Sequence, residues 1–262
     1  MPLLRENCQP LTALISLESS LTAVRVNLQK MLNHTYSVLS MSAVGRKHKE
    51  NQDRALARTI PWTPTPLYLL VVADGISSCV YGGSVARFIV ERHLAVDEIF
   101  HPEGQPIGDQ LKDYLVALNK SFHNEFSDME EMQASGASLS VAVVCGDVAD
   151  CFWVGDSPIY ISRQIPTGFE SELILIPDKD GNALTDHFGG AAPFNLKHRH
   201  LTLAVGDILT ITSDGVVHDS DLLSRSYARI GFNQAFLNEV KDRANRSPVS
   251  DDISLVACKR VH

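Results

Sequence analysis

Three strand-like segments follow one another in the middle of the chain, and this succession limits the possible folds more than any other feature. The segments are Ala137–Cys145, Ala149–Val154 and Pro158–Arg163, and the dipeptides Gly146-Asp147 and Gly155-Asp156 separate them. Such dipeptides favour the tight turns that join antiparallel strands. A parallel doubly wound sheet would need a helix between successive strands. We therefore predict an α+β fold in which helices, inserted in blocks, cover antiparallel sheets.

The pattern on either side of this run adds further strands and helices. Apolar segments bounded by turn residues predict strands, and apolar residues at helical spacing predict helices. The predicted strands are Val38–Val44, Leu67–Ala73, Leu173–Ile176, Asp207–Thr212 and Ile253–Val261, and the predicted helices are Gly82–Leu94, Ile107–Phe126 and Phe232–Asn245. The segment Leu67–Ala73 is so apolar that we expect both of its faces to be covered. An irregular stretch is expected from Ile176 to about His200.

The first part of the chain differs from the rest. Residues 11–33 predict a helix, because apolar residues recur there at steps of three and four; these residues are Leu14, Leu17, Leu21, Val24, Leu28 and Met31. Two interpretations stay open, a helix packed on its own domain or a helix that docks a partner or a second copy of the chain. We expect an N-terminal helical extension over residues 1–36 and one folded domain over residues 37–262.

Composition excludes several classes of function. Lysine and arginine total 23 and aspartate and glutamate total 31, so the formal net charge is −8. Proteins that bind nucleic acids usually carry an excess of basic residues, which this chain does not have. The longest clean apolar run, Leu67–Ala73, is far shorter than a membrane span. The five cysteines show no CxxC spacing, which favours reduced thiols, and the N-terminal apolar stretch is too interrupted for a secretory signal. We therefore expect a cytoplasmic protein without a membrane span.

Carboxylates recur where predicted strands meet loops. Any one of these acids would be interpreted as an ordinary turn residue. Together, carboxylates at the edge of a core repel one another and resist loss of water. A hard divalent cation such as Mg²⁺ or Mn²⁺, which prefers oxygen ligands, would remove that conflict. The acids in question are Asp53, Asp74, Asp156, Asp214 and Asp251.

An ordered set of motifs resembles one known family. The set is GRKHKENQD, VADGISSCVYGG, GASLSVAV, VGDSPIYISR, LT-x-x-FGG, GDILTITSDG and DDISLVA, running from about Ser42 to Lys259. In this order and spacing the motifs resemble the bacterial form of the PP2C-type, metal-dependent protein serine/threonine phosphatases. No single motif is specific, but the ordered set is.

The resemblance implies both a fold and a metal centre. The expected fold is a β-sandwich of two antiparallel sheets flanked by helices (αββα), with two Mg²⁺ or Mn²⁺ ions at one end between the sheets. The implied metal ligands are Asp53, Asp74, the Gly75 carbonyl, Asp214 and Asp251, with Asp156 helping to hold a third ion. The implied catalytic residues are Asp53, Asp74, Asp214 and Asp251. A hydroxide that bridges the two metals would attack phosphorus in line.

Several positions depart from the family pattern. Many relatives carry an arginine where this chain has His48, so we expect His48 and the neighbouring Arg46 to grip substrate phosphate. Lys47 and Lys49 are interpreted as solvated loop residues. Asp252 stands where the family usually has asparagine, and we expect it to lie behind the metal ligands. Residues 164–200 occupy the place of the family's variable flap, which is expected to shape substrate choice.

The predicted function is the metal-dependent hydrolysis of phosphoserine and phosphothreonine in proteins. The alternative is a pseudophosphatase that binds phosphopeptides or partners without turnover, an interpretation prompted by the departures at His48, in the DGISS motif and at Pro158. The retained carboxylates argue against that alternative. The resemblance also implies a phosphorylated protein substrate and a cognate serine/threonine kinase as partners.

Overall fold

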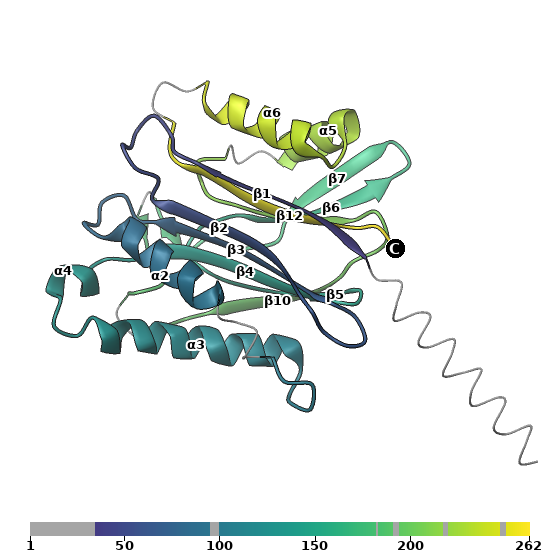
Figure 1. The fold of residues 1–262 in the computed structure, drawn as a ribbon. Coiled ribbons are helices and arrows are strands. Elements are labelled where there is room, and N and C mark those ends of the chain that lie inside the picture. Colours follow the sequence, from purple (N-terminus) through teal and green to yellow (C-terminus); the bar gives the residue numbers. More distant parts are fainter. Residues whose placement is uncertain (1–34, 95–99, 182, 191–193, 217–219, 247–249) are drawn as a thin grey trace, which may run out of the picture.

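Two five-stranded sheets form the centre of the molecule. The computed structural model describes residues 35–94, 100–181, 183–190, 194–216, 220–246 and 250–262, so the predicted helix over residues 11–33 lies outside the described residues. The first sheet has the order β1 (Tyr36–Ala43), β12 (Ile253–Arg260), β11 (Ile208–Thr212), β6 (Ile159–Ile165) and β7 (Gly168–Leu173). The second sheet has the order β10 (Lys197–Thr202), β5 (Val148–Val154), β4 (Ala137–Cys145), β3 (Leu67–Gly75) and β2 (Asp53–Ile60). Figure 1 shows the two sheets facing each other.

All strand pairs within the two sheets are antiparallel, as the run of strands in the middle of the chain predicts. The turn between β4 and β5 contains Gly146 with φ +64°, a left-handed conformation that glycine adopts at little steric cost. β5 and β6 lie in different sheets, so the Gly155-Asp156 turn carries the chain from one sheet to the other. The predicted α+β sandwich is thus confirmed. Of the two turn dipeptides, Gly146-Asp147 joins two paired strands of one sheet, and Gly155-Asp156 joins strands of different sheets.

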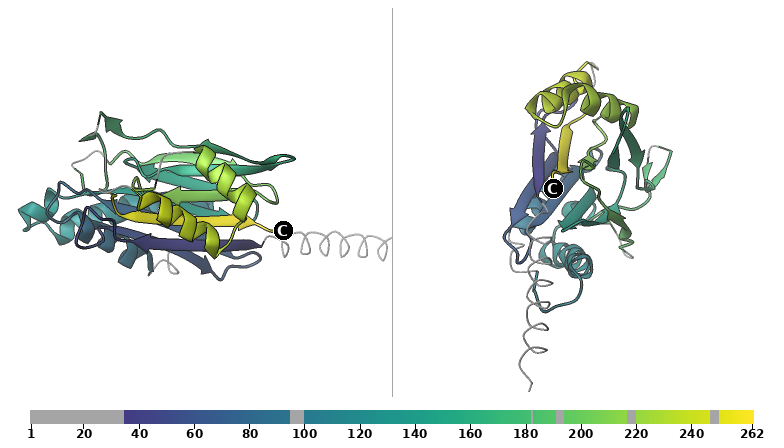
Figure 2. Two further views of the ribbon diagram at one scale, coloured as in Figure 1. Left: turned by 90° about the horizontal axis from the view of Figure 1, so that it is seen from above. Right: turned by 90° about the vertical axis from the view of Figure 1, so that its right-hand side faces the viewer.

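Helices cover the outer faces of both sheets. α2 (Gly82–Leu94) and α3 (Ile107–Glu125), followed by the short α4 (Glu130–Gln133), lie on the second sheet, and α5 (Ser220–Ile230) and α6 (Gln234–Ala244) lie on the first. The two views of Figure 2 show the resulting layers of helix, sheet, sheet and helix. Asn233 caps α6, because its side chain accepts hydrogen bonds from the backbone N–H groups of Ala235 and Phe236.

Strand β3 explains why the second sheet is buried on both sides. Its odd-numbered residues from Leu67 to Ala73 pack in the cluster beneath α2 and α3, whereas Tyr68, Leu70 and Val72 pack between the two sheets. Side chains alternate along a strand, so a continuously apolar strand supplies both clusters at once. A third cluster fills the space between the first sheet and the helices α5 and α6.

Some boundaries differ from the predicted ones. The predicted strand Leu173–Ile176 is wrong: β7 ends at Leu173, and the adjacent Ile174 and Leu175 are both buried in an irregular segment. The helix predicted from Phe232 begins after Asn233. Strand β2 and helix α5 were not predicted. The expected irregular stretch to about His200 is also wrong near its end, because β10 pairs with β5.

The range expected to form a flap therefore contains parts of both sheets. β7 and β10 extend the first and the second sheet, respectively. Between them lies a small hairpin of β8 (Lys179–Asp180) and β9 (Ala183–Leu184). We refer to these two strands, residues 179–180 and 183–184, as the flap hairpin.

Candidate active site

The space between the sheets changes from apolar to polar at one end. In β3 the residues that face the first sheet are Tyr68, Leu70 and Val72, and the next position of the same parity is Asp74. Asp53 stands opposite Asp74 in the β2–β3 pairing, and Ser138 of β4 stands opposite Asp74 on its other side. The alternation that builds the apolar core therefore also directs a row of polar side chains into the space between the sheets.

Asp53 and Asp74 are two acids in a site that disfavours their charge. Asp53 is 1% exposed, and its Oδ2 atom is buried without a hydrogen-bond partner. Burial raises the pKa of Asp53 to about 6, and the negative charge of Asp252 acts in the same direction. Burial and the charges of Asp53 and Asp214 raise the pKa of Asp74 well above its ordinary value. The pair would gain from a nearby positive charge.

A polar cavity of about 250 Å³ opens in front of Asp74. Four of the five predicted acids line it, and they come from the ends of different strands: β3, the loop after β5, the loop after β11 and the loop before β12. The lining residues are Lys47, Asp74, Gly75, Ile76, Ser77, Ser78, Ser138, Asp156, Lys179, Leu184, Asp214 and Asp251. Asp53 is not among them and lies beside Asp74 in the adjacent strand.

Two lysines provide the cations within this cavity. The Nζ atom of Lys47 is 2.6 Å from Asp251 Oδ2, and this hydrogen bond is the main cause of the raised pKa of Lys47. Lys179 forms an ion pair with Asp156 and approaches Asp214 Oδ2 at 4.0 Å. Burial opposes the charge of Lys179, but the contacts with these acids outweigh it and raise its pKa.

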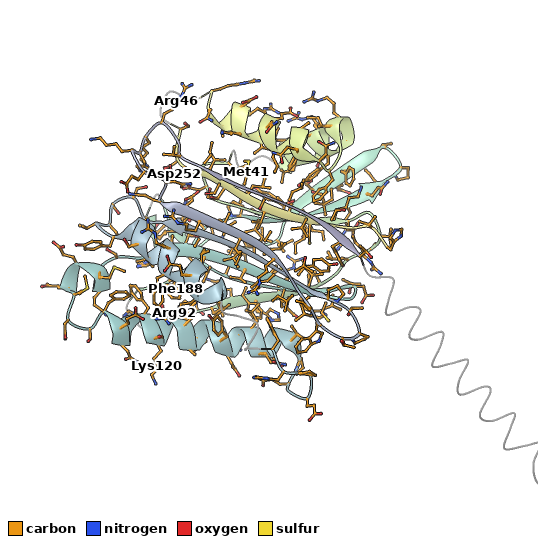
Figure 3. All side chains as sticks on the ribbon, viewed as in Figure 1. Met41, Arg46, Arg92, Lys120, Phe188 and Asp252 are labelled. Carbon is orange, nitrogen blue, oxygen red and sulfur yellow. The ribbon has the colours of Figure 1, made fainter. Side chains whose placement is uncertain are left out.

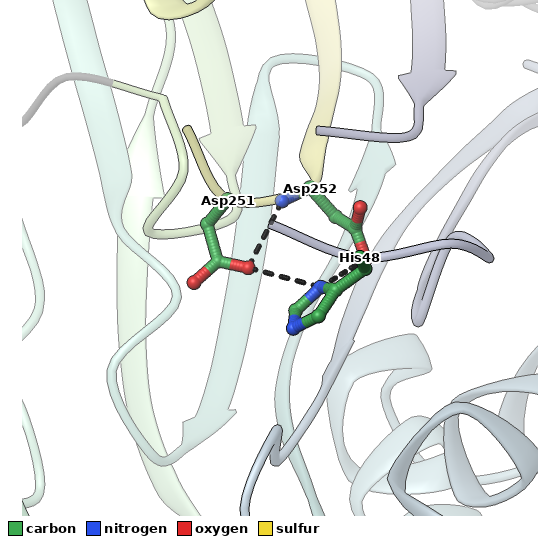
Figure 4. A group of neighbouring side chains, drawn as sticks. All are labelled: His48, Asp251 and Asp252. Carbon is green, nitrogen blue, oxygen red and sulfur yellow. Dashed lines mark hydrogen bonds and ion pairs between the residues drawn. The ribbon is translucent and has the colours of Figure 1, made fainter. Parts of the chain in front are cut away.

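His48 faces the segment before β12 (Figure 4). Its Nδ1 atom is 3.1 Å from Asp252 Oδ2 and 3.3 Å from Asp251 Oδ1. Asp252 is buried, and it also accepts hydrogen bonds from the backbone N–H groups of Gly45 and Gln52, at 2.8 and 2.7 Å. Asp252 therefore joins the loop before β2 to the start of β12 and orients the His48 ring. Among the described residues, His48, Asp251 and Asp252 bring their ligand atoms within 4.8 Å of one another.

Close backbone packing holds the two consecutive acids in place. A Cβ atom at Gly45 would lie 2.1 Å from the carbonyl oxygen of Asp251, and one at Gly215 would lie 1.8 Å from the carbonyl oxygen of Asp252. Only glycine leaves room for these approaches. The loop after β1 and the loop after β11 thus contact the same two residues from different sides.

The two residues expected to grip phosphate lie outside the cavity lining. Arg46 is exposed, its backbone N–H donates to Ser250 Oγ, and Figure 3 shows its side chain at the edge of the molecule. His48 is turned toward Asp252. Lys47, interpreted from sequence as a solvated loop residue, is 46% exposed, and it also lines the cavity in an ion pair with Asp251.

Sequence reasoning missed two polar residues of the cavity, Ser138 and Lys179. Ser138 Oγ lies 2.7 Å from Ser157 Oγ and accepts a hydrogen bond from the backbone N–H of Asp156, so it fixes the turn that carries this acid. Its place in GASLSVAV, opposite Asp74 in an antiparallel pair, was the available signal. Lys179 lies in the flap hairpin, where no periodic pattern points to the cavity.

The donor set fits divalent cations. It consists of carboxylates, among them an Asp53 oxygen without a partner and an Asp74 carboxyl whose pKa is raised by its acidic neighbours. Oxygen-only sets of this kind suit Mg²⁺ and Mn²⁺. Asp53, Asp74, Asp214 and Asp251 are the residues that would hold such ions, and the Gly75 backbone lies beside them.

Comparisons with solved structures show the same fold. Serine/threonine phosphatase Stp1 from Staphylococcus aureus has a TM-score of 0.77 at 16% identity, covering 88% of this chain and 97% of that one. The catalytic domain of serine/threonine protein phosphatase PstP, in complex with two manganese ions, has a TM-score of 0.70 at 18% identity, covering 87% and 100%. PppA, a regulatory component of the type VI secretion system in Pseudomonas aeruginosa, has a TM-score of 0.67 at 22% identity, covering 86% and 97%.

The fold is that of the serine/threonine phosphatases named above. The family model of protein phosphatase 2C matches residues 44–252, which is most of the chain. The chain belongs to the protein phosphatase 2C family, as the ordered motifs predict. No curated protein matches the sequence. None of the helices that the structure describes is long and apolar enough to cross a membrane.

Proposed function

We propose that this protein hydrolyses phosphoserine and phosphothreonine in proteins, using two Mg²⁺ or Mn²⁺ ions held by Asp53, Asp74, Asp214 and Asp251. The observation that carries the proposal is the paired arrangement of Asp53 and Asp74, two acids with raised pKa values at the polar end of an apolar core. Without a nearby cation, two buried acids side by side lower the stability of the folded state. The manganese ions in the PstP structure support the choice of ion.

Each part of the site has a distinct task in this proposal. Divalent cations, when bound, supply an activated water and offset charge on the phosphoryl oxygens. Asp74 would hold the positive charge at the cavity wall, with Asp53 beside it in the adjacent strand, and the more exposed Asp214 and Asp251 would hold it nearer the mouth. Lys47 lines the same cavity, so we propose that its ammonium attracts the phosphate dianion. Asp252 keeps the His48 ring oriented beside Asp251.

Hydrolysis of a phosphothreonine peptide by the purified chain with added Mn²⁺ tests the proposal. We expect activity that is abolished by chelator and reduced by at least about a thousandfold in Asp74→Asn, since a metal-ligand loss removes several kcal/mol of transition-state stabilisation. Asp128→Asn alters an exposed acid outside the cavity and should retain full activity. Native protein without turnover across both metals and pH 6–9 would contradict the proposal.

The ion pairs in the cavity favour a second candidate function, a pseudophosphatase that binds phosphopeptides without turnover. Lys47 and Lys179 already offset charge on Asp251 and Asp156, so the carboxylates have an internal source of positive charge. Calorimetric titration with Mn²⁺ separates the two candidates. Binding of the metal favours the phosphatase, and phosphopeptide binding without metal binding favours the pseudophosphatase.

Five further expectations stay predictions. A phosphorylated protein substrate and a cognate kinase follow from the phosphatase class. Phosphate binding by His48 and Arg46, docking or self-association through residues 1–36, and a cytoplasmic location are proposals. Co-purification of the full chain with a kinase, and its oligomeric state with and without residues 1–33, are the measurements that address the partners.

A further inference from the structure

The flap hairpin is fixed beside the crossing between the two sheets. Asp178, the residue before it, donates its backbone N–H to the Gly155 carbonyl at 3.0 Å and accepts the Gly155 N–H on its Oδ2 atom at 3.0 Å. The Thr185 N–H donates to the Asp178 carbonyl at 2.8 Å and closes the hairpin. These bonds hold residue 178 beside residue 155, and from there the Lys179 side chain reaches Asp156.

Lys179 uses this position to contact two acids of the cavity. The Asp156 side chain is 7% exposed and pairs with the Lys179 ammonium, and Asp214, at 4.0 Å, is 38% exposed. A nearly buried carboxylate without a partner would be strongly unfavourable. Lys179 therefore supplies at Asp156 the positive charge that a metal ion would otherwise supply. Leu184 of the same hairpin also lines the cavity.

We infer that Lys179 is a tethered cation that occupies the position beside Asp156, excludes a third divalent ion from it, and holds the flap hairpin over the cavity. An ammonium and a divalent ion repel each other and compete for the same carboxylate oxygens. The Lys47–Asp251 pair is 46% and 30% exposed, so water can replace that lysine when a metal binds, whereas Asp156 is only 7% exposed and Lys179 is held beside it by the flap hairpin. The inference rests on the proposed function, because it concerns the number of ions that the site accepts.

Counting Mn²⁺ ions by calorimetric titration tests the exclusion. We expect two ions for the native chain and for Lys179→Arg, which keeps the charge, and three for Lys179→Met. The double variant Lys179→Met with Asp156→Asn should return to two ions. Lys120→Met, which removes an exposed lysine of α3, should match the native chain. Three ions in the native chain, or two in Lys179→Met, would overturn the exclusion.

Hydrogen exchange of residues 178–185 in chelator tests the tether without any metal. Loss of the ion pair should speed exchange of the hairpin amides by about fivefold or more in Lys179→Met, the effect of losing one partly buried ion pair, but not in Lys179→Arg or Lys120→Met. Unchanged exchange in Lys179→Met would overturn the tether. If the native chain bound no Mn²⁺ while Lys179→Met still sped exchange, the two-metal proposal would fail and the tether would stand.

Discussion

Asp53 and Asp74 stand directly opposite each other in the β2–β3 pairing, with their side chains in the same space between the two sheets. Two acids at paired positions of neighbouring strands destabilise a sheet unless something offsets their charge. The protein therefore carries, where β2 begins and β3 ends, a local source of instability that coincides with its proposed metal centre.

The first prediction concerns pH and the metal-free protein. The pKa of Asp53 is raised from 3.8 to about 6, so its stabilising contribution is complete below about pH 4 and is lost as the pH rises through about 6. The loss amounts to about 3 kcal/mol, since each pKa unit corresponds to about 1.4 kcal/mol. Asp53→Asn stays neutral. We therefore compare the unfolding free energies of Asp53→Asn and of the native chain, both in chelator. The value for Asp53→Asn minus the value for the native chain should increase between pH 4 and pH 7.

Urea unfolding at several pH values measures this difference, and subtraction of the two curves removes the titration of groups elsewhere. A difference that stays constant across pH 4–7 would mean that the charge of Asp53 is already offset in the metal-free protein.

The second prediction concerns stabilisation by metal. A ligand that binds only the folded state stabilises it by about 2.7 kcal/mol when its concentration is one hundred times its Kd. For a chain of this size each kcal/mol raises Tm by about 2–4 °C, so saturating Mn²⁺ should raise Tm by about 5–10 °C. Asp74→Asn should lose most of the increase, and Asp128→Asn should keep it. Equal increases in both variants would place the bound ions elsewhere.

The third prediction concerns the close approach at Gly215. In Gly215→Ala the new methyl group would lie 1.8 Å from the Asp252 carbonyl oxygen, so the backbone around both consecutive acids must shift. We expect a loss of about 2–3 kcal/mol in unfolding free energy and at least tenfold weaker Mn²⁺ binding. Gly146→Ala provides the control, because its Cβ meets no atom within 4 Å and only the φ of +64° disfavours it. That variant should lose about 1 kcal/mol and bind Mn²⁺ normally.

The fourth prediction concerns the buried carboxylate of Asp252. Its two oxygens accept hydrogen bonds from Gly45 N–H and Gln52 N–H, and Oδ2 also contacts His48. An asparagine has a single acceptor oxygen, so its amide NH₂ would face a backbone donor. Asp252→Asn should therefore destabilise the metal-free protein by about 1–3 kcal/mol, measured by urea unfolding at pH 7. An unchanged midpoint would show that the loop before β2 rearranges without cost.

The sequence predicted the parts of the fold in which local pattern and burial agree. Strand β3 is apolar on both faces, and Asp74 was expected at its end because it directly follows the apolar run. The structure adds that Asp74 continues the parity of Leu70 and Val72. Strand β2 was missed because Arg54 and Arg58 interrupt its apolar pattern. Arg54 directs its guanidinium to the backbone carbonyls of Asn51 and Asp53, a local arrangement that periodicity does not encode.

The cation partners of the site could not be predicted because they depend on distant contacts. Lys179 reaches Asp156 only because Asp178 pairs with Gly155 across more than twenty residues of intervening chain. Likewise, His48 faces Asp252 because two backbone donors from its own loop are fixed on that carboxylate. In both cases the residue types were visible in the sequence and their orientations were not.

The β2–β3 pairing also makes the site an indicator of correct folding. If β2 shifted by a single residue against β3, every side chain of β2 would move to the opposite face, and Asp53 would point toward α2 instead of the first sheet. A misaligned chain could retain most of its secondary structure and yet lack one wall of the carboxylate cluster. Cation binding would then distinguish correctly aligned molecules from misaligned ones that overall spectroscopic measurements count as folded.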